Sequence, residues 1–235
     1  MMMTIRAATA SLVLLTAFGA HVAGAAPLLY DVNSAGSPTQ AGWTPVNLTG
    51  INGVTFSAVG DVFLAERDRS NLNTDGVGGD VANNSMWRDF VFADQRDAEF
   101  PPGVPVVTGP PVAPAGMDIT IANLAADTRY DVSLWAFDEV SNGTRDMFWN
   151  GVPYSFNDSP DPTSLNDRVV KFSVLTDSQG VALLQGRIDF SQLDPCCNVF
   201  VNGFSLTEVP EPGSLALVSL ALAGAGIAHR RRRSA

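Results

Sequence analysis

The sequence predicts an all-β protein, an antiparallel β-sandwich of the jelly-roll type. Three observations lead to this prediction: apolar and polar residues alternate in many short segments, turn-forming residues separate these segments, and no part of the body keeps a helical period. The chain has 235 residues, which is enough for one sizeable core. Its net charge of −10 argues against a general nucleic-acid-binding role, because polyanions are repelled.

The predicted strands follow one another along residues 26–208, which we expect to form a single domain. Asn-Gly, Asp-Gly and Ser-Pro pairs lie between them and supply turn chemistry. Two longer segments, residues 70–85 and 101–114, are predicted as loops at one edge of the sandwich. The strands are expected at residues 28–32, 54–59, 62–66, 88–93, 117–121, 130–137, 146–150, 170–174, 184–190 and 198–207.

The first 25 residues have the pattern of a secretory signal peptide, which would form a short helix. Arg6 precedes an apolar run over residues 7–20, and Ala23-Gly24-Ala25 supplies a small-x-small cleavage site. We expect cleavage after Ala25; the alternative is an uncleaved membrane anchor.

The C-terminal segment, residues 209–235, has three parts in a fixed order. Pro210, Glu211 and Pro212 come first, then an apolar run over residues 215–228, and then a cluster of Arg230, Arg231, Arg232 and Arg233. At about 1.5 Å per residue the apolar helix is shorter than a bilayer core of about 30 Å, although a short span remains open. The arginines are expected on the cytoplasmic side. The alternative is an ordinary C-terminal helix.

These three parts resemble the PEP-CTERM sorting signal of Gram-negative and related bacteria. The resemblance implies export, transient anchoring in the inner membrane, and recognition by an exosortase as partner. It also implies association with the cell surface and exopolysaccharide.

The body between the two ends is acidic and contains no histidine. Residues 27–209 hold nine basic and 23 acidic side chains, while His21 and His229 lie in the terminal segments. This excludes Ser-His-Asp and Cys-His catalysis and any histidine metal site in the body. A carboxylate pair of the glycosidase type stays open, but no pair stands out.

Several short motifs follow one another through the body: Tyr30-Asp31-Val32, a turn at residues 37–46 that contains Gln40-Ala41-Gly42-Trp43, Arg67-Asp68-Arg69, Arg88-Asp89-Phe90, Tyr130-Asp131-Val132 and Asn202-Gly203-Phe204. Their order resembles that of galactose-binding-domain-like sandwiches, which are appended to polysaccharide-degrading enzymes. This resemblance implies a non-catalytic module that binds sugars through aromatic faces and planar polar side chains.

The candidate ligand-binding residues fall into an aromatic group and a charged group. The aromatic candidates are Trp43, Trp87, Trp135, Trp149 and Tyr154; the alternative is that each is a core aromatic. Trp135 is preferred because it falls on the same side of its strand as Asp131 and Ser133, and Trp149 because it lies near a strand end, before an Asn-Gly turn. The charged candidates are Arg67, Arg69, Arg88 and Asp89, for which the alternative is a structural ion-pair network. Because the body is acidic, neutral glycans or cation-bridged contacts are expected unless its few arginines cluster.

Calcium is the one cofactor that the sequence suggests. Asn71, Asn73, Asp75 and Gly76 resemble the start of a calcium loop, but position twelve is Ala82, so an EF-hand is excluded. A looser site using Asp75 and Asp80 remains as a hypothesis, against a solvated polar loop.

The two cysteines, Cys196 and Cys197, are adjacent and cannot close a long loop. We favour a vicinal disulfide or buried thiols over pairing between chains.

The leading functional hypothesis is a non-catalytic, exported surface protein with a carbohydrate-binding sandwich. The alternatives are a structural matrix or adhesion protein that binds proteins or itself, and a carboxylate-dependent glycosidase or lyase.

Overall fold

The computed structural model describes residues 25–34, 37–68, 85–94, 114–138, 144–157, 162–190 and 198–210. These residues form thirteen strands and one short 3₁₀ turn, η2 (Ser85–Trp87). The strands are β1 (Leu28–Val32), β2 (Thr44–Val46), β3 (Val54–Val59), β4 (Phe63–Asp68), β5 (Asp89–Asp94), β6 (Gly116–Ile121), β7 (Arg129–Trp135), β8 (Arg145–Trp149), β9 (Val152–Phe156), β10 (Val169–Leu175), β11 (Ala182–Ile188), β12 (Asn198–Val201) and β13 (Gly203–Glu208). The predicted all-β class is confirmed.

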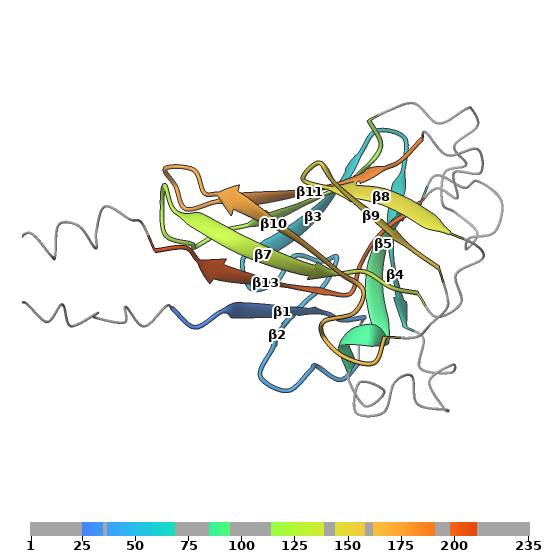
Figure 1. Cartoon of the computed structure of the whole chain (residues 1–235), viewed down its shortest axis with the longest axis horizontal. Helices are drawn as coiled ribbons and strands as arrows, with labels where there is room; N and C mark the ends of the chain where they lie inside the picture. The colour runs from blue at the N-terminus through green and yellow to red at the C-terminus, as the bar shows by residue number, and fades with distance from the viewer. Residues whose placement is uncertain are drawn as a thin grey trace, which may run out of the picture.

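The strands form three sheets. Sheet A has the order β10-β7-β13-β1-β2, sheet B has the order β3-β6-β11-β8-β9, and sheet C has the order β12-β5-β4. Among the described pairings, β1 with β2 is parallel and the others are antiparallel. Figure 1 shows β10, β7, β13 and β1 of sheet A side by side, with β4 and β5 of sheet C crossing at one end.

One core lies between the sheets. Alternate residues of β7 are buried, namely Tyr130, Val132 and Leu134, and Met117, Ile119 and Ile121 of β6 are buried in the same way. This is the period-two pattern of strands with one face on a core. The sheets share a single cluster of buried apolar side chains.

The predicted single strand over residues 198–207 is wrong in one respect: it is two strands that meet at Asn202. β12 pairs with β5 of sheet C, whereas β13 pairs with β1 and β7 of sheet A. Asn202 carries the chain from one sheet to the other, so a continuous run of extended residues changes its partner strand there.

Two strands were not predicted, β2 and β9. Each contains a proline, Pro45 or Pro153, and each lies at an edge of its sheet. Proline argues against a central strand but is tolerated at an edge, where its missing N–H is not needed. The two flanking helices and almost all of the two long loops that the sequence predicts lie outside the described residues.

Candidate functional site

The predicted charged cluster forms where β4 meets β5. Their register places Asp68 opposite Asp89, and Arg88 turns back onto Asp68. Arg88 Nε lies 2.5 Å from Asp68 Oδ1, and Arg88 Nη2 donates to Oδ2 at 2.7 Å. The guanidinium of Arg67 lies 5.0 Å from the ring centre of Phe92. Both described arginines of the cluster are therefore engaged within the fold, and Arg69 lies outside the described residues.

Asp89 lies underneath this ion pair and is fully buried. Ser37 Oγ donates a hydrogen bond of 2.9 Å to Asp89 Oδ1. Burial raises the pKa of Asp89 to about 6, and the hydrogen bond from Ser37 only partly offsets this rise. Asp89 therefore acts as an internal anchor for the segment that contains Ser37.

Three buried side chains hold the loop between β1 and β2. Asn33 Nδ2 donates to the carbonyl of Pro38 at 2.9 Å, and Asp31 Oδ2 accepts the Gln40 N–H at 2.5 Å. Together with Asp89, these contacts fix residues 37–40, which lead directly into Trp43. Buried hydrogen bonds of this kind favour one loop conformation.

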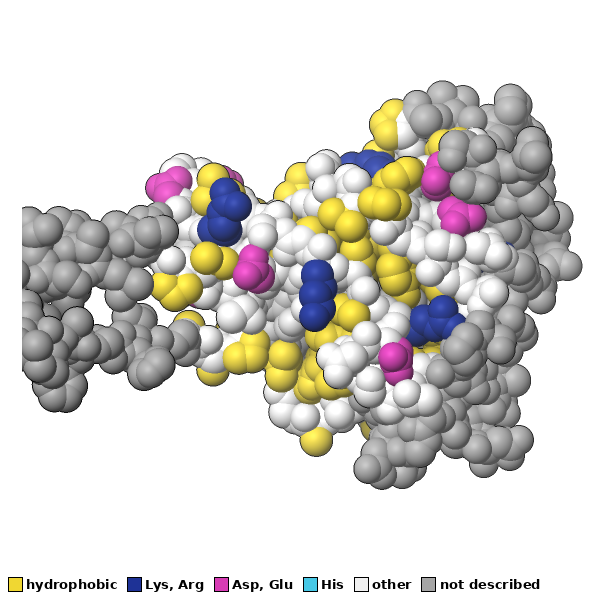
Figure 2. Space-filling model, in the orientation of Figure 1, with side chains coloured by type: hydrophobic (Ala, Val, Ile, Leu, Met, Phe, Trp, Pro, Cys, Tyr) yellow, Lys and Arg dark blue, Asp and Glu magenta, His cyan; other side chains and the backbone are white. Residues whose placement is uncertain are grey.

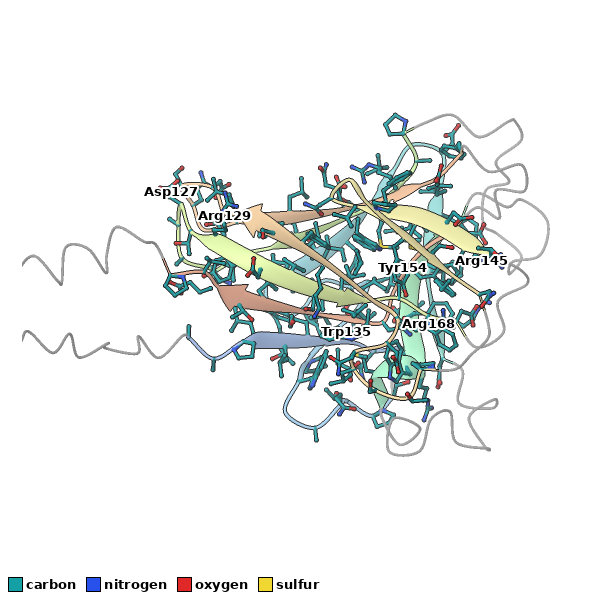
Figure 3. The ribbon with its side chains drawn as sticks, viewed as in Figure 1. Asp127, Arg129, Trp135, Arg145, Tyr154 and Arg168 are labelled. Carbon is teal, nitrogen blue, oxygen red and sulfur yellow. The ribbon has the colours of Figure 1, made fainter. Side chains whose placement is uncertain are left out.

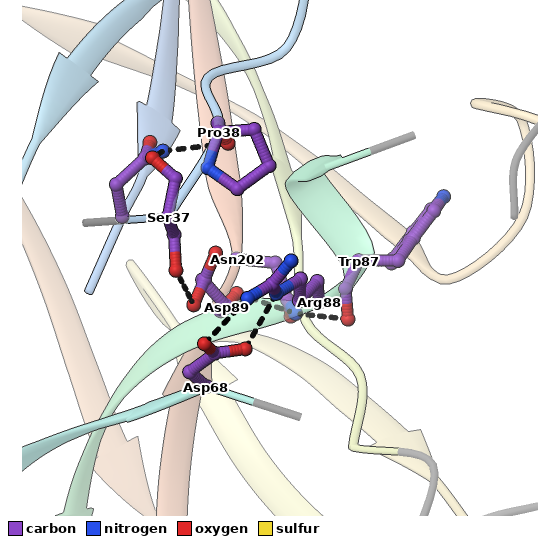
Figure 4. A network of polar contacts seen from close by, with 8 residues as sticks. Ser37, Pro38, Asp68, Trp87, Arg88, Asp89 and Asn202 are labelled. Atoms are coloured by element: carbon purple, nitrogen blue, oxygen red, sulfur yellow. Dashed lines mark hydrogen bonds and ion pairs between the residues drawn. The ribbon is translucent and has the colours of Figure 1, made fainter. Parts of the chain in front are cut away.

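Asn202 connects the charged cluster to the end of β7 (Figure 4). Its Nδ2 donates to the carbonyl of Asp89 at 3.0 Å, and its Oδ1 accepts the N–H of Phe137 at 2.7 Å. Its backbone N–H donates to the carbonyl of Trp135 at 2.9 Å. Sequence reasoning noted Asn202 only as the start of the closing motif. The available signal was an Asn-Gly pair between two apolar parts of the segment predicted as one strand.

The aromatic candidates differ in how much of each ring remains accessible. Trp149 is fully buried and lies against Gly186, where an added Cβ would come within 2.9 Å of the indole. Trp87 and Trp135 are 5% and 6% exposed, whereas Trp43 and Tyr154 are half-buried. Trp149 therefore offers no face to a ligand, and Trp43 is the candidate tryptophan with accessible surface.

Trp135 and Trp43 form an aromatic pair at the end of β7. Their ring centres are 5.3 Å apart at an interplanar angle of 60°, an edge-to-face arrangement. Trp135 Nε1 donates to the carbonyl of Leu165 at 2.8 Å. Trp135 is therefore the buried support of Trp43.

Two further hydrogen bonds join Ala136, just after β7, to neighbouring segments of the chain. Tyr154 donates from its hydroxyl to the carbonyl of Ala136 at 2.7 Å, and the Ala136 N–H donates to the carbonyl of Arg168. Burial raises the pKa of Tyr154 above its usual value, so the hydroxyl stays protonated as a donor. Figure 3 shows Trp135, Tyr154 and Arg168 gathered in this region.

The Trp43–Trp135 pair borders the outer face of sheet A. Here the residues opposite to the core-facing ones lie in cross-strand rows: Trp135 with Val169, Ser133 with Lys171, and Asp131 with Ser173. Lys171 is exposed, and Ser173 Oγ donates to Asp131 Oδ1 at 2.7 Å. The face thus combines an aromatic pair at one end with hydroxyl, carboxylate and ammonium groups, a combination suited to sugar hydroxyls and sugar C–H faces.

Several predicted sites lie outside the described residues: Asp75 and Asp80, Cys196 and Cys197, and the tail from Glu211 and Pro212 to Arg230–Arg233. Within the residues that the structure does describe, no three His, Cys, Asp or Glu side chains gather as metal ligands. Across the same residues, none of the helices has the length and apolar character needed to span a membrane.

Comparison with solved structures finds similar chains at low identity. A chain in the crystal structure of the plant peptide RALF23 in complex with FER and LLG2 is 11% identical over 80% of this chain, with a TM-score of 0.42. The ANX2 ectodomain from Arabidopsis thaliana is 10% identical over 79% of this chain, with a TM-score of 0.43. This chain spans 41% and 50% of those two chains.

A bacterial chain is also similar to this one. The CBM22-1 xylan-binding domain from Paenibacillus barcinonensis is 8% identical, with a TM-score of 0.30, and the match covers 66% of this chain and 86% of that domain. Comparison with curated protein sequences finds no match.

One family matches the chain directly. Residues 208–233 match the PEP-CTERM protein-sorting motif. The match begins at Glu208, the last residue of β13, and Val209 still donates its N–H to the carbonyl of Arg129 at 2.9 Å. The chain therefore carries a PEP-CTERM sorting motif that starts where the central strand of its sheet A ends.

Proposed function

We propose that this protein is a non-catalytic, exported surface protein whose sandwich binds polysaccharide on the outer face of sheet A. The sorting motif supports export to the cell surface. The observation that carries the binding proposal is the half-buried Trp43, held edge-to-face on Trp135 beside the polar rows of that face.

Buried polar side chains fix the position of Trp43. Asp31, Asn33 and Asp89 are almost completely buried, yet each holds the loop that precedes Trp43. Pre-ordering of an aromatic side chain lowers the entropy cost of stacking on a sugar ring. The same contacts explain Asp89 as a residue that positions the loop, and Arg88 as the ion-pair partner of Asp68, rather than as groups that contact the ligand.

The sorting motif adds a geometric constraint to this function. The chain leaves sheet A at Pro210, and β1 begins beside it because Leu28 pairs with Leu206. Trp43 and Trp135 belong to the other end of the β1–β13–β7 strands. While the tail anchors the protein, the Trp43–Trp135 end of the proposed binding surface is the end remote from the anchor.

The test is affinity electrophoresis of the full chain, kept in non-ionic detergent, through gels that contain a panel of soluble polysaccharides. We expect retardation by at least one polysaccharide and its loss in Trp43→Ala. Phe148→Ala is the matched control, because Phe148 is a half-buried aromatic on the outer face of sheet B. No retardation by any polysaccharide, or equal loss in both variants, would contradict the proposal.

Sorting is tested separately by mass spectrometry of the C-terminus. We propose that an exosortase removes the tail, so protein from a host that has the enzyme should end near residues 210–212. In a host from which the exosortase gene has been deleted, the same protein should retain Arg230–Arg233. An intact tail in both hosts would contradict processing but leave the binding proposal untouched.

A further inference from the structure

The described basic side chains divide into two groups. Five of the seven are engaged within the fold, because they form ion pairs, lie over aromatic rings or are buried: Arg67, Arg88, Arg145, Arg168 and Arg187. The other two, Arg129 and Lys171, are exposed, and neither forms an ion pair with any residue that the structure describes.

Both of these side chains lie on the outer face of sheet A. Lys171 is opposite Ser133 on β7, and Arg129 is on β7 itself, in register with Leu175. They share this face with Trp135, which is two residues beyond Ser133. Figure 2 shows Lys and Arg side chains spread along this side of the molecule, with acidic side chains as well as uncharged surface between them.

The spacing of these groups fits an extended polymer. At about 3.4 Å per residue along β7, the Lys171 row lies about 7 Å from Trp135 and the Arg129 row about 20 Å from it. An aromatic stacking position and two cations thus follow one another along a strand, over a length of several sugar rings.

We propose that the outer face of sheet A selects an acidic polysaccharide, with Lys171 and Arg129 contacting carboxylates of the ligand and Trp43 packing on a sugar ring. The inference rests on the proposed function and names its ligand class. It also revises the expectation of neutral glycans, which followed from the net charge of the whole body.

The acidic body does not forbid such a ligand. Charges are screened over about 8 Å at physiological ionic strength, so a polymer on this face responds mainly to the charges beside it. Those charges include Asp131, which lies between the two cations and accepts a hydrogen bond from Ser173, and Asp127, in the loop before β7. Asp131 is placed to accept hydrogen bonds from sugar hydroxyls between acidic positions.

The test compares polygalacturonate with its carboxyl-reduced form, a neutral polymer of the same linkage, by affinity electrophoresis of the full chain. We expect stronger retardation by polygalacturonate, weakened by added salt. Lys171→Gln and Arg129→Gln should each weaken binding to the acidic polymer by about two- to fivefold and leave binding to the neutral polymer unchanged. Lys171→Arg should keep the preference.

Arg187→Gln is the matched control, because it removes one positive charge from the outer face of sheet B. Equal binding of the two polymers, preference for the neutral one, or the same loss in Arg187→Gln as in Lys171→Gln would overturn the acidic selectivity. In those cases, loss of binding in Trp43→Ala would still support polysaccharide binding itself. Retardation by neither polymer would overturn the acidic selectivity, and the broader panel then decides the proposed function.

Discussion

Sheets A and B have the same alternation of buried and outward residues, but their outer faces differ. On sheet A the loop at residues 37–43 packs on the outward Asp31 and Trp135, which are 0% and 6% exposed, whereas Lys171 and Leu175 of β10 remain exposed. On sheet B the outward Leu183 is 42% exposed, and Asp118 and Arg187 form an ion pair beside it. Alternation along a strand determines which side chains point away from the core, whereas the packing of loops determines whether those side chains are exposed to solvent.

The largest expected effect separates the two tryptophans at the ends of these sheets. Trp149→Ala removes a fully buried indole from sheet B and should lower the free energy of unfolding by about 3–5 kcal/mol. Trp43→Ala removes a half-buried ring and should cost clearly less stability while abolishing polysaccharide retardation. Chemical denaturation of both variants, followed by fluorescence, measures the difference; equal destabilisation would show that Trp43 is a core residue.

The second prediction concerns the buried carboxyl of Asp89, the first residue of β5. The pKa of Asp89 is raised to about 6, so its ionised form destabilises the folded state above that pH. The contribution of the Asp89 carboxyl to the free energy of unfolding is therefore greatest below the pKa that this group has in the unfolded chain. It is lost as the pH rises through 6, the pKa in the folded state. Between pH 4 and pH 7 the loss is on the order of 2–3 kcal/mol.

Asp89→Asn tests this assignment. The variant keeps an acceptor for Ser37 but removes the charge, so it should be more stable than wild type at pH 7 and lack that part of the pH dependence. Urea denaturation of both proteins at pH 4.5 and pH 7 measures it. A constant stability difference between them at the two pH values would contradict the assignment.

The smallest effect is expected at the point where the chain passes from sheet C to sheet A. Asn202→Ala leaves the Phe137 N–H and the Asp89 carbonyl without their partner and should cost about 1–3 kcal/mol. Because Asn202 also lies beside Trp135, amide hydrogen exchange should rise at residues 135–137 more than in sheet B. Uniform exchange across both sheets would show that Asn202 has only a global role.

Much of the fold was predictable from local patterns. The strands at residues 28–32 and 54–59 were predicted with the bounds that the structure has. The edge strands β2 and β9 were missed since Pro45 and Pro153 hide them, and the break at Asn202 was missed because alternation does not reveal a change of partner strand.

The candidate site was less predictable. Trp135 and Trp149 both occupy strand ends, yet one supports Trp43 and the other is enclosed beside Gly186. Arg88 and Asp89 were selected together for their charge, but Asp89 holds the loop through Ser37 whereas Arg88 forms an ion pair with Asp68. The free cations Arg129 and Lys171 were not selected, since their shared face depends on the pairing of β7 with β10.

The sequence by itself determined the class of the fold and the sorting motif, because alternation, turn residues and a tail of three ordered parts are all local patterns. Only the tertiary structure decided which aromatic and charged residues form a surface. Exposure and partnership depend on residues distant in the chain: Asn202 reaches Phe137 and Asp89, and the loop that ends in Trp43 folds onto Trp135. Contacts between residues so far apart in the sequence cannot be recognised from the spacing of residue types along the chain.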